Sequence, residues 1–165
     1  MRLYVVRHGI AIDRNDPASP ADPARALTAD GILKTQAAAR GFRALGAAPE
    51  VFLTSPYTRA LETAELFAAA FDVSKSALRK TAALKPCANP RAIFQEIAKL
   101  NGKDVACFGH ATHLDEMISL ALGAKGAATA LKKAGIACLE MKSAVPPQAT
   151  IGWLLTGKML RALAR

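Results

Sequence analysis

The sequence has few cysteines, few aromatic side chains, fewer acidic than basic residues and no long apolar run. Its 3 cysteines lie far apart and form no CxxC pair, which excludes a disulfide scaffold and is typical of small buried thiols in a reducing compartment. No apolar stretch approaches the roughly 20 residues that span a bilayer. An aspartate and several arginines soon follow the short apolar start, which argues against a signal peptide. These absences predict a cytoplasmic protein without membrane association.

The length and composition suit one compact domain that covers residues 1–165. Hydrophobic residues make up 52% of the chain, which is enough for a core, whereas aromatic residues make up only 5%. The core is therefore expected to consist mainly of Leu, Ile, Val and Ala. The abundant alanine favours helices that pack closely against another layer.

The formal net charge is +9, which points to an anionic partner. The chain has no Lys/Arg run, and its Trp and Tyr side chains do not interleave with basic residues. A phosphate group or an acidic protein partner is therefore favoured over nucleic acid. The simpler alternative is that the charge only keeps the protein in solution.

Short apolar runs alternate with helical patterns along the chain. Strands are expected at 3–6, 51–54, 78–84, 105–108, 136–142 and 150–155, with the last two as antiparallel neighbours. A helix is expected at 28–45 with Thr28 as its N-cap, and further helices are expected from 55 onward, from 89 onward, at 112–122 and at 159–164. The Pro-, Ala- and Asp-rich segment 13–24 is expected to be a loop that forms a lid or the edge of a site.

This alternation predicts an α/β three-layer sandwich, with a mostly parallel central sheet and helices on both faces. In such sheets ligands bind just beyond the carboxyl ends of the strands. Three segments follow expected strands: Arg7-His8-Gly9, residues 55–59 and Gly109-His110. We therefore expect them to meet at one edge of the sheet.

The side chains in these segments suit phosphoryl chemistry. Arg7 and Arg59 carry planar, permanent charges that match phosphate oxygens. His8 offers a nucleophilic ring nitrogen near neutral pH, and a protonated His110 would add a third positive donor. Gly9 would let a ligand approach the backbone. Together these groups could stabilise the charge on a phosphoryl group in transfer.

Simpler interpretations exist for each residue and for the cluster. Arg7 and His8 taken alone suit a polar strand end, Arg59 a surface helix and His110 a satisfied core histidine. A metal site is the rival interpretation, because His110 and His113 lie three residues apart, with Asp115 and Glu116 beyond them. However, the chain contains no HExxH, and it has neither a GxxxxGK[ST] nor a GxGxxG phosphate motif. We therefore predict neither a metal ion nor a cofactor.

Four segments in order along the chain resemble the histidine phosphatase superfamily. They are Arg7-His8-Gly9 after the first strand, the R-x-L-T-x-x-G turn at 25–31, the SP-x-x-RA-x-x-TA segment at 55–64, and Gly109-His110. The short length and the late patterns at 133–137 and 153–156 are similar to the SixA-like phosphohistidine phosphatase branch. The resemblance covers nearly the whole chain.

The resemblance implies a phosphoglycerate mutase-like fold and a metal-independent phosphatase. In that family pattern His8 attacks phosphorus and becomes a transient phosphohistidine. Arg7, Gly9, Arg59 and His110 would contact the phosphoryl group, and water would then hydrolyse the intermediate. The implied substrate is phosphohistidine on a signalling protein, such as a histidine-phosphotransfer domain, or a small phosphorylated molecule. We expect a monomer.

The chain departs from the family pattern in two places. Ala111-Thr112-His113 replaces a segment that contains Glu and Pro in many relatives. The middle region 84–89 has no carboxylate, where larger relatives carry a glutamate acid. Since an imidazole leaves more readily than a sugar alkoxide, a site without a strong acid should favour phosphoramidates. Asp13 or Asp16 could supply an acid, but both are better interpreted as exposed loop carboxylates.

Two other functions remain open at this point. The missing acid and the altered segment after His110 also fit a phosphate-recognising module with little turnover. A sugar or small-molecule phosphatase of the same superfamily is the third alternative, although the short chain and the missing acid disfavour it.

Overall fold

The computed structural model describes residues 1–164 and contains a 6-stranded sheet with the strand order β3-β2-β4-β1-β5-β6. The strands are β1 (Arg2–Arg7), β2 (Val51–Thr54), β3 (Arg79–Lys80), β4 (Val105–Gly109), β5 (Ile136–Ala144) and β6 (Pro147–Leu155). The pairs β1–β4, β4–β2 and β2–β3 are parallel, whereas β1–β5 and β5–β6 are antiparallel. The predicted α/β architecture with a mostly parallel sheet is confirmed.

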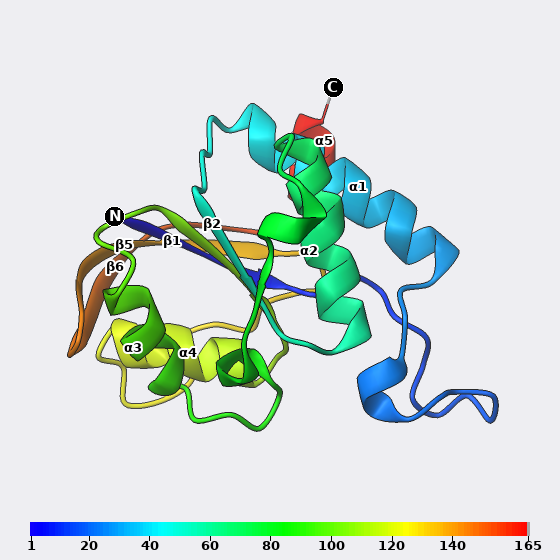
Figure 1. The fold of residues 1–165 in the computed structure, drawn as a ribbon, viewed down its shortest axis with the longest axis horizontal. Coiled ribbons are helices and arrows are strands. Elements are labelled where there is room, and N and C mark those ends of the chain that lie inside the picture. The colour runs from blue at the N-terminus through cyan, green and yellow to red at the C-terminus, as the bar shows by residue number, and fades with distance from the viewer. Residues whose placement is uncertain (165) are drawn as a thin grey trace.

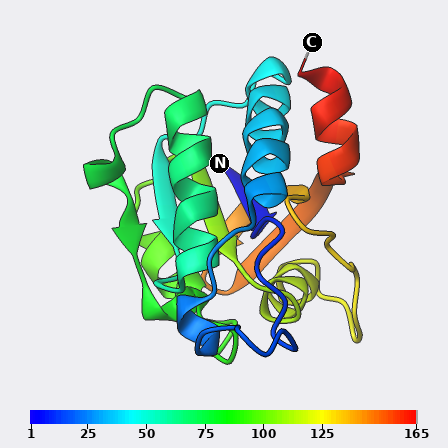
Figure 2. The ribbon, with the colours of Figure 1, turned by 90° about the vertical axis from the view of Figure 1, so that its right-hand side faces the viewer.

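Helices cover both faces of this sheet, as Figures 1 and 2 show. One face carries α1 (Ala29–Ala44), α2 (Thr58–Ala70) and α5 (Gly157–Leu163), and the other carries α3 (Ala92–Ala98) and α4 (His113–Ala121). None of these helices, among residues 1–164, is long and apolar enough to cross a membrane.

Side-chain alternation along the strands divides the core into two layers. In β1, Leu3 and Val5 pack toward α3 and α4, while Tyr4 and Val6 pack toward α1, α2 and α5. β4 alternates in the same way, with Cys107 on the first face and Phe108 on the second. Both faces of the central strands are therefore apolar, which explains the continuous hydrophobic runs in the sequence.

Most predicted elements are confirmed, with shifted ends. Thr28 caps α1 as predicted, since its hydroxyl accepts a hydrogen bond from the Gly31 amide at 3.0 Å. The helix α2 begins at Thr58, not at Ser55. The strand β5 extends past the predicted 142, and β6 already begins at Pro147. As an edge strand, β6 tolerates a residue without an amide hydrogen.

The predicted third strand at 78–84 is wrong for most of its length. Only Arg79 and Lys80 pair with β2, at the edge of the sheet. Immediately afterwards the Thr81 hydroxyl accepts a hydrogen bond from the Ala83 amide at 3.0 Å and begins the 3₁₀ turn η3 (Ala82–Leu84). A local side-chain cap thus replaces the ladder that the β-prone composition suggested.

The segment 13–24, which we call the approach loop, is held at its base and crosses one end of the sheet. Ala11 and Leu27 form an isolated antiparallel bridge, and the Ile12 amide donates to the Ala26 carbonyl at 3.0 Å. The loop ends in the short 3₁₀ turn η1 (Asp22–Ala24). These contacts bring the loop against the carboxyl end of β1, where the candidate site lies.

Candidate active site

The predicted side chains Arg7, His8, Arg59 and His110 line one pocket of about 230 Å³. The pocket lies beyond the carboxyl ends of β1 and β4, and Lys133 adds a further positive charge to its lining. The rings of His8 and His110 lie 5.3 Å apart between centroids. The predicted meeting of the separate segments is therefore confirmed. We call this cavity the phosphoryl pocket.

Backbone pairing explains why these residues meet. β1 and β4 run parallel side by side, and beyond their last pair the His8 amide donates to the Gly109 carbonyl at 3.0 Å. His8 and His110 therefore leave the sheet at the same edge. Arg59 belongs to the first turn of α2, which follows β2, the next strand along the sheet. Three strand ends thus supply the four side chains.

The hydrogen bonds of His8 define its tautomer. Its Nδ1 lies 2.7 Å from the Gly9 carbonyl oxygen, which can only accept, so Nδ1 carries the proton. Its Nε2 then carries a lone pair, and it accepts a hydrogen bond from Arg59 Nε at 3.3 Å. A neutral imidazole with this tautomer presents Nε2 as a nucleophile.

Both site histidines are neutral at pH 7. Burial, with the charges of Arg59, Arg7 and Lys133, lowers the pKa of His8 to about 3, although the hydrogen bond to Gly9 opposes the shift. Burial and the Arg59 charge likewise lower the pKa of His110 to about 3. The expectation that a protonated His110 supplies a third positive charge is therefore not met, because desolvation disfavours the imidazolium.

His110 instead makes one neutral hydrogen bond and keeps one nitrogen unused. Its Nε2 lies 2.9 Å from the hydroxyl oxygen of Ser55. Its buried Nδ1 has no partner among the described residues. The Tyr57 ring packs edge-on against this imidazole at 5.3 Å and holds its orientation.

Arg59 is almost fully buried, with 2% exposure, and all three of its nitrogens have partners. Besides the contact with His8, Nη1 donates to the Asp22 carbonyl at 2.7 Å and Nη2 donates to Asp22 Oδ2 at 3.2 Å. The guanidinium therefore connects the nucleophile to the approach loop. Because each Nη carries two hydrogens, Arg59 keeps donors for a bound anion.

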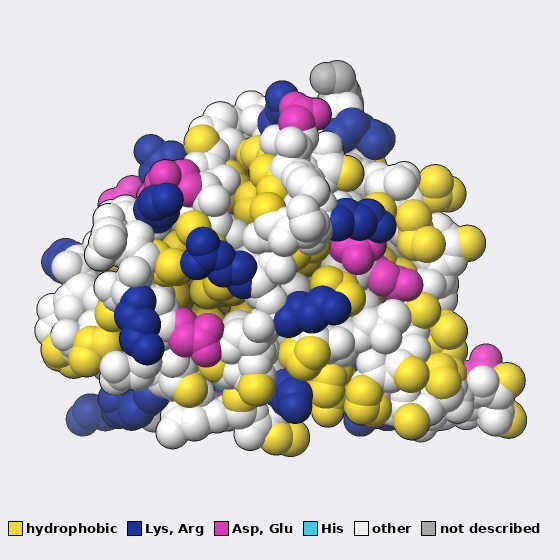
Figure 3. All heavy atoms as spheres, in the orientation of Figure 1, with side chains coloured by type: hydrophobic (Ala, Val, Ile, Leu, Met, Phe, Trp, Pro, Cys, Tyr) yellow, Lys and Arg dark blue, Asp and Glu magenta, His cyan; other side chains and the backbone are white. Residues whose placement is uncertain are grey.

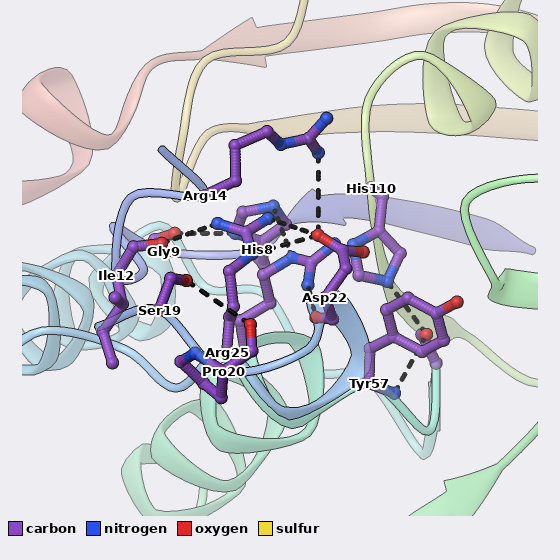
Figure 4. Close-up of polar contacts among 12 residues, drawn as sticks. His8, Gly9, Ile12, Arg14, Ser19, Pro20, Asp22, Arg25, Tyr57 and His110 are labelled. Carbon is purple, nitrogen blue, oxygen red and sulfur yellow. Dashed lines mark hydrogen bonds and ion pairs between the residues drawn. The ribbon is translucent and has the colours of Figure 1, made fainter. Parts of the chain in front are cut away.

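Asp22 joins three arginines at the mouth of the pocket (Figure 4). Its Oδ1 accepts from Arg25 Nε at 3.0 Å and Nη2 at 2.7 Å, and Arg14 Nη2 lies 3.6 Å from the same oxygen. Partial burial raises the pKa of Asp22, but the hydrogen bonds and charges of Arg25 and Arg59 outweigh it, so the pKa lies below its ordinary value. Asp22 is therefore ionised at neutral pH.

Arg7 is held by the segment that follows α4. Its Nη1 donates to the Leu131 carbonyl at 2.6 Å, while its Nε is buried without a partner. Asp115 fixes the segment that provides this carbonyl, because its Oδ1 accepts from Thr129 Oγ1 at 2.7 Å and from the Leu131 amide at 2.9 Å. Asp115 is thus a positioning residue for Arg7.

Gly9 has a packing role that differs from the predicted ligand contact. It does not line the phosphoryl pocket, and its amide already donates to Thr63 Oγ1 at 3.0 Å. A Cβ at this position would lie only 2.2 Å from Thr35 Oγ1 on α1. Glycine is therefore needed for the close approach of α1 to the segment after β1.

Sequence reasoning missed several residues of the site. Nothing in the sequence pattern singles out Asp22 or Arg14 within the approach loop, or Lys133 and Ser55 within their segments. The only signal is the spacing of Asp22 and Arg25, three residues apart in η1 and the turn that follows. Asp13 does line the pocket, whereas Asp16 does not. Both are exposed, as predicted.

The rival metal site finds no support in the geometry. Residues 1–164 contain no group of three or more His, Cys, Asp or Glu side chains that could hold a metal ion. The carboxylate of Asp115 is used by Thr129 and Leu131, and His113 is buried, with neither ring nitrogen bonded to any described residue.

Comparison with known sequences gives the family. A family model of the histidine phosphatase superfamily (branch 1) matches residues 3–85, which include Arg7, His8 and Arg59. The chain belongs to this superfamily. An uncharacterised protein from Picosynechococcus sp. is 49% identical over 70 residues, which cover 42% of this chain and 41% of that protein. The match therefore spans less than half of this relative.

Several solved structures share the fold. The protein histidine phosphatase SixA complexed with tungstate has a TM-score of 0.82 at 20% identity, over 96% of this chain and 98% of that one. A phosphoserine phosphatase from Entamoeba histolytica has a TM-score of 0.75 at 15% identity, over 96% and 98%. A mycobacterial glucosyl-3-phosphoglycerate phosphatase has a TM-score of 0.71 at 13% identity, over 94% and 98%. The chain is thus SixA-like in fold.

Proposed function

We propose that the protein is a phosphatase in which His8 accepts the phosphoryl group, and that its substrates are phosphohistidine side chains. The observation that carries this proposal is the tautomer of His8. Its Nδ1 is tied to the Gly9 carbonyl, so the nucleophilic lone pair is on Nε2. Within residues 1–164 the one hydrogen bond of Nε2 is that from Arg59 Nε at 3.3 Å, in a pocket lined by Arg7, Arg59 and Lys133.

The reaction would proceed in two transfers. His8 Nε2 attacks phosphorus while the leaving group departs on the opposite side, and phosphohistidine forms. Water then attacks the same phosphorus, and His8 is regenerated as phosphate leaves. Arg7, Arg59 and Lys133 stabilise the charge on the equatorial oxygens, and His110 donates as a neutral imidazole. Since these side chains supply the positive charge, no metal ion is part of the proposal.

The substrate class follows from the leaving group. The region 84–89 has no carboxylate, and the exposed Asp13 is tied to the Asn15 amide at 2.9 Å. Without a well-placed proton donor, alkoxide departure is slow, whereas a protonated imidazole departs readily. These features favour phosphohistidine over phosphoserine and sugar phosphates. A protein that carries the phosphohistidine is the proposed partner, and the protein is proposed to act as a monomer in the cytoplasm.

The distribution of charge supports a local phosphate site more than a nucleic-acid surface. Lys and Arg side chains are dispersed among apolar and acidic ones on the face drawn in Figure 3, and they form no continuous stripe there. The basic groups that do converge, in the phosphoryl pocket, surround a volume of about 230 Å³. A phosphoryl group suits such a volume, whereas a duplex backbone does not.

The first experiment replaces His8 with Ala. We expect turnover of an aryl phosphate to fall by about 10⁴-fold or more, because the nucleophile is lost. With ³²P-labelled substrate and a rapid quench that contains no acid, a burst of labelled, acid-labile phosphoenzyme should appear in the unmodified protein and not in the His8 variant. His113→Asn is the matched control, since this third histidine is buried but does not line the pocket. Retained turnover in the His8 variant would remove His8 from the mechanism.

The second experiment compares a phosphohistidine peptide with a phosphoserine peptide in the presence and absence of EDTA. We expect the phosphohistidine peptide to react faster and EDTA to have no effect. A preference for phosphoserine would overturn the leaving-group assignment, and strong inhibition by EDTA would revive a metal mechanism. Tight phosphate binding without turnover of either peptide or of an aryl phosphate would favour the phosphate-recognising module.

A further inference from the structure

A second pocket of about 560 Å³ adjoins the phosphoryl pocket, and we call it the outer pocket. Residues that line both pockets mark the mouth between them; they are Arg14, Asp22, Arg25, Pro86 and Ala111. In an in-line transfer the leaving group lies opposite the attacking nitrogen, and the outer pocket is an adjoining cavity into which a leaving group can extend. Asp22 is the only acidic side chain that lines the outer pocket among the described residues.

Asp22 keeps acceptor capacity toward the mouth. Its Oδ1 is occupied by Arg25, but Oδ2 has a single protein donor, Arg59 Nη2 at 3.2 Å. Each carboxylate oxygen can accept two hydrogen bonds, and the side chain is 42% exposed. A substrate N–H can therefore reach Oδ2 without displacing any of the arginines.

We propose that Asp22 determines leaving-group specificity by accepting a hydrogen bond from a protonated nitrogen heterocycle, so that the site selects phosphoramidates of the imidazole class. This role presupposes that the protein acts through His8 as proposed above. The carboxylate faces the ring that departs, next to the arginines that hold the phosphoryl oxygens. The aromatic side chain of Tyr57, which lines the outer pocket, offers a surface for the planar ring.

The transfer balances with one proton taken from solvent. The ring nitrogen that is not bonded to phosphorus takes up that proton, and the resulting N–H donates to Asp22 Oδ2. His8 Nε2 then forms a bond to phosphorus, while the P–N bond breaks and its electron pair stays on the ring nitrogen. The ring leaves as neutral imidazole and keeps the proton. Asp22 favours the protonated ring because opposite charges attract, and this is the form that departs.

Asp22 is not suited to the opposite role of proton donor. A donor must hold a proton at the working pH, whereas Arg25, Arg59 and Arg14 surround this carboxylate with positive charge. The same negative charge repels a phenolate or alkoxide as it forms. The carboxylate therefore distinguishes leaving groups by charge: it assists cationic rings and does not assist anionic oxygens.

The test measures kcat/KM for N-phosphoimidazole and for p-nitrophenyl phosphate in Asp22→Asn. Asparagine keeps the shape and an acceptor oxygen but removes the charge. We expect the ratio of kcat/KM for N-phosphoimidazole to kcat/KM for p-nitrophenyl phosphate to fall by about 10- to 100-fold, which corresponds to the loss of one charge-assisted hydrogen bond. The loss should be larger at pH 8 than at pH 6, because at lower pH solvent protonates the ring without help from Asp22.

Two matched variants accompany the test. Asp13→Asn removes the other carboxylate of the phosphoryl pocket, which does not line the outer pocket, and should leave the ratio unchanged. Asp22→Glu keeps the charge, so its ratio of the two kcat/KM values should lie between those of the unmodified protein and of Asp22→Asn. It also replaces Asp22→Asn in the test if that variant folds poorly.

The outcomes separate the two proposals. If both rates fall by the same factor at both pH values, Asp22 only orients the arginines and the inference is overturned. A ratio that rises would overturn it too. If the unmodified protein hydrolyses neither compound, the proposed function itself fails.

Discussion

The floor of the phosphoryl pocket and the approach loop are built in different ways. The floor consists of Arg7, His8, Arg59 and His110, which leave the sheet edge or the adjoining helix, and three of them are at most 8% exposed. The approach loop provides Arg14 and Asp22, whose side chains are 70% and 42% exposed. The floor is held by strand pairing and burial, whereas the loop is held by the backbone hydrogen bonds at its base and by ion pairs.

The two regions therefore have different tasks: the floor carries the chemistry, and the loop at the mouth contributes to the choice of substrate. Side chains that contact the reacting atoms in the transition state must be positioned to within a fraction of an ångström. The edge of the sheet supplies the rigid support that this requires. Groups that choose among leaving groups lie at the mouth, where a substrate first makes contact. Arg59 joins the two regions, because it contacts both His8 and Asp22.

Among the changes that test this comparison of floor and loop, the largest effect should come from Arg59→Lys. Lysine keeps the charge, but its donors share one nitrogen and cannot reach the separate positions that Arg59 Nε, Nη1 and Nη2 reach toward His8 and Asp22. We expect kcat/KM for p-nitrophenyl phosphate to fall by about 10²- to 10³-fold, as for loss of a transition-state donor.

The matched variant is Arg25→Lys, since Arg25 also binds Asp22 but has no contact with His8. The loss of kcat/KM should be smaller, about 10-fold or less, because Arg25 lines the mouth and binds Asp22 but does not hold the nucleophile. Equal losses in steady-state kinetics would break the distinction between floor and loop.

A further effect concerns the free energy of unfolding at low pH. The pKa values of His8 and His110 are lowered to about 3 in the folded protein. The unfolded chain, with ordinary histidine pKa values, therefore binds more protons as the pH falls below about 6.5. The free energy of unfolding should fall by up to about 1.4 kcal/mol per pH unit for each histidine until the folded pKa is reached.

Urea unfolding at pH 7 and pH 5 measures this loss. The double variant His8→Asn/His110→Asn should lose less stability over the same interval, because it has no imidazole to protonate at these positions. An equal loss would mean that the floor histidines are not desolvated. A result of that kind would remove burial as the property that separates floor from loop.

The smallest effect should come from Arg14→Ala. The pair Arg14–Asp22 spans 3.6 Å and is exposed, so we expect the free energy of unfolding to change by less than about 0.5 kcal/mol. Lys34→Ala is the control, because the exposed Lys34–Asp30 pair lies on α1, outside the residues that line the pocket. A large loss for Arg14 alone would show that the loop depends on this ion pair.

Much of the fold could be predicted from local pattern. The strand at 51–54 was predicted with its observed bounds, and the N-cap Thr28 was identified from its position before an amphipathic run. The strand at 78–84 could not be predicted correctly, because a single hydroxyl, Thr81, diverts the chain into a turn. Local side-chain bonds of this kind compete with β-propensity and leave no periodic signal.

The floor of the site was predictable and its mouth was not. Strand-end placement pointed to His8 and His110, since parallel strands deliver their ends to one edge. Asp22 lies in a loop rich in Pro, Ala and Asp, where nothing in the local pattern separates one carboxylate from another. Its partner Arg59 is 37 residues away. The need for glycine at position 9 also could not be predicted, because it comes from the close packing of α1 against this segment, with Thr35 Oγ1 only 2.2 Å from the site of a Cβ.

The continuous apolar strands, the capped helices and the charged segments that follow strands can be identified from the sequence alone, because each depends on residues that are neighbours along the chain. Only the tertiary structure decided that His8 presents Nε2, that His110 is neutral and that Asp22 faces the mouth. Those properties depend on burial and on partners from distant segments, and desolvation and charge act through space, whatever the separation along the chain.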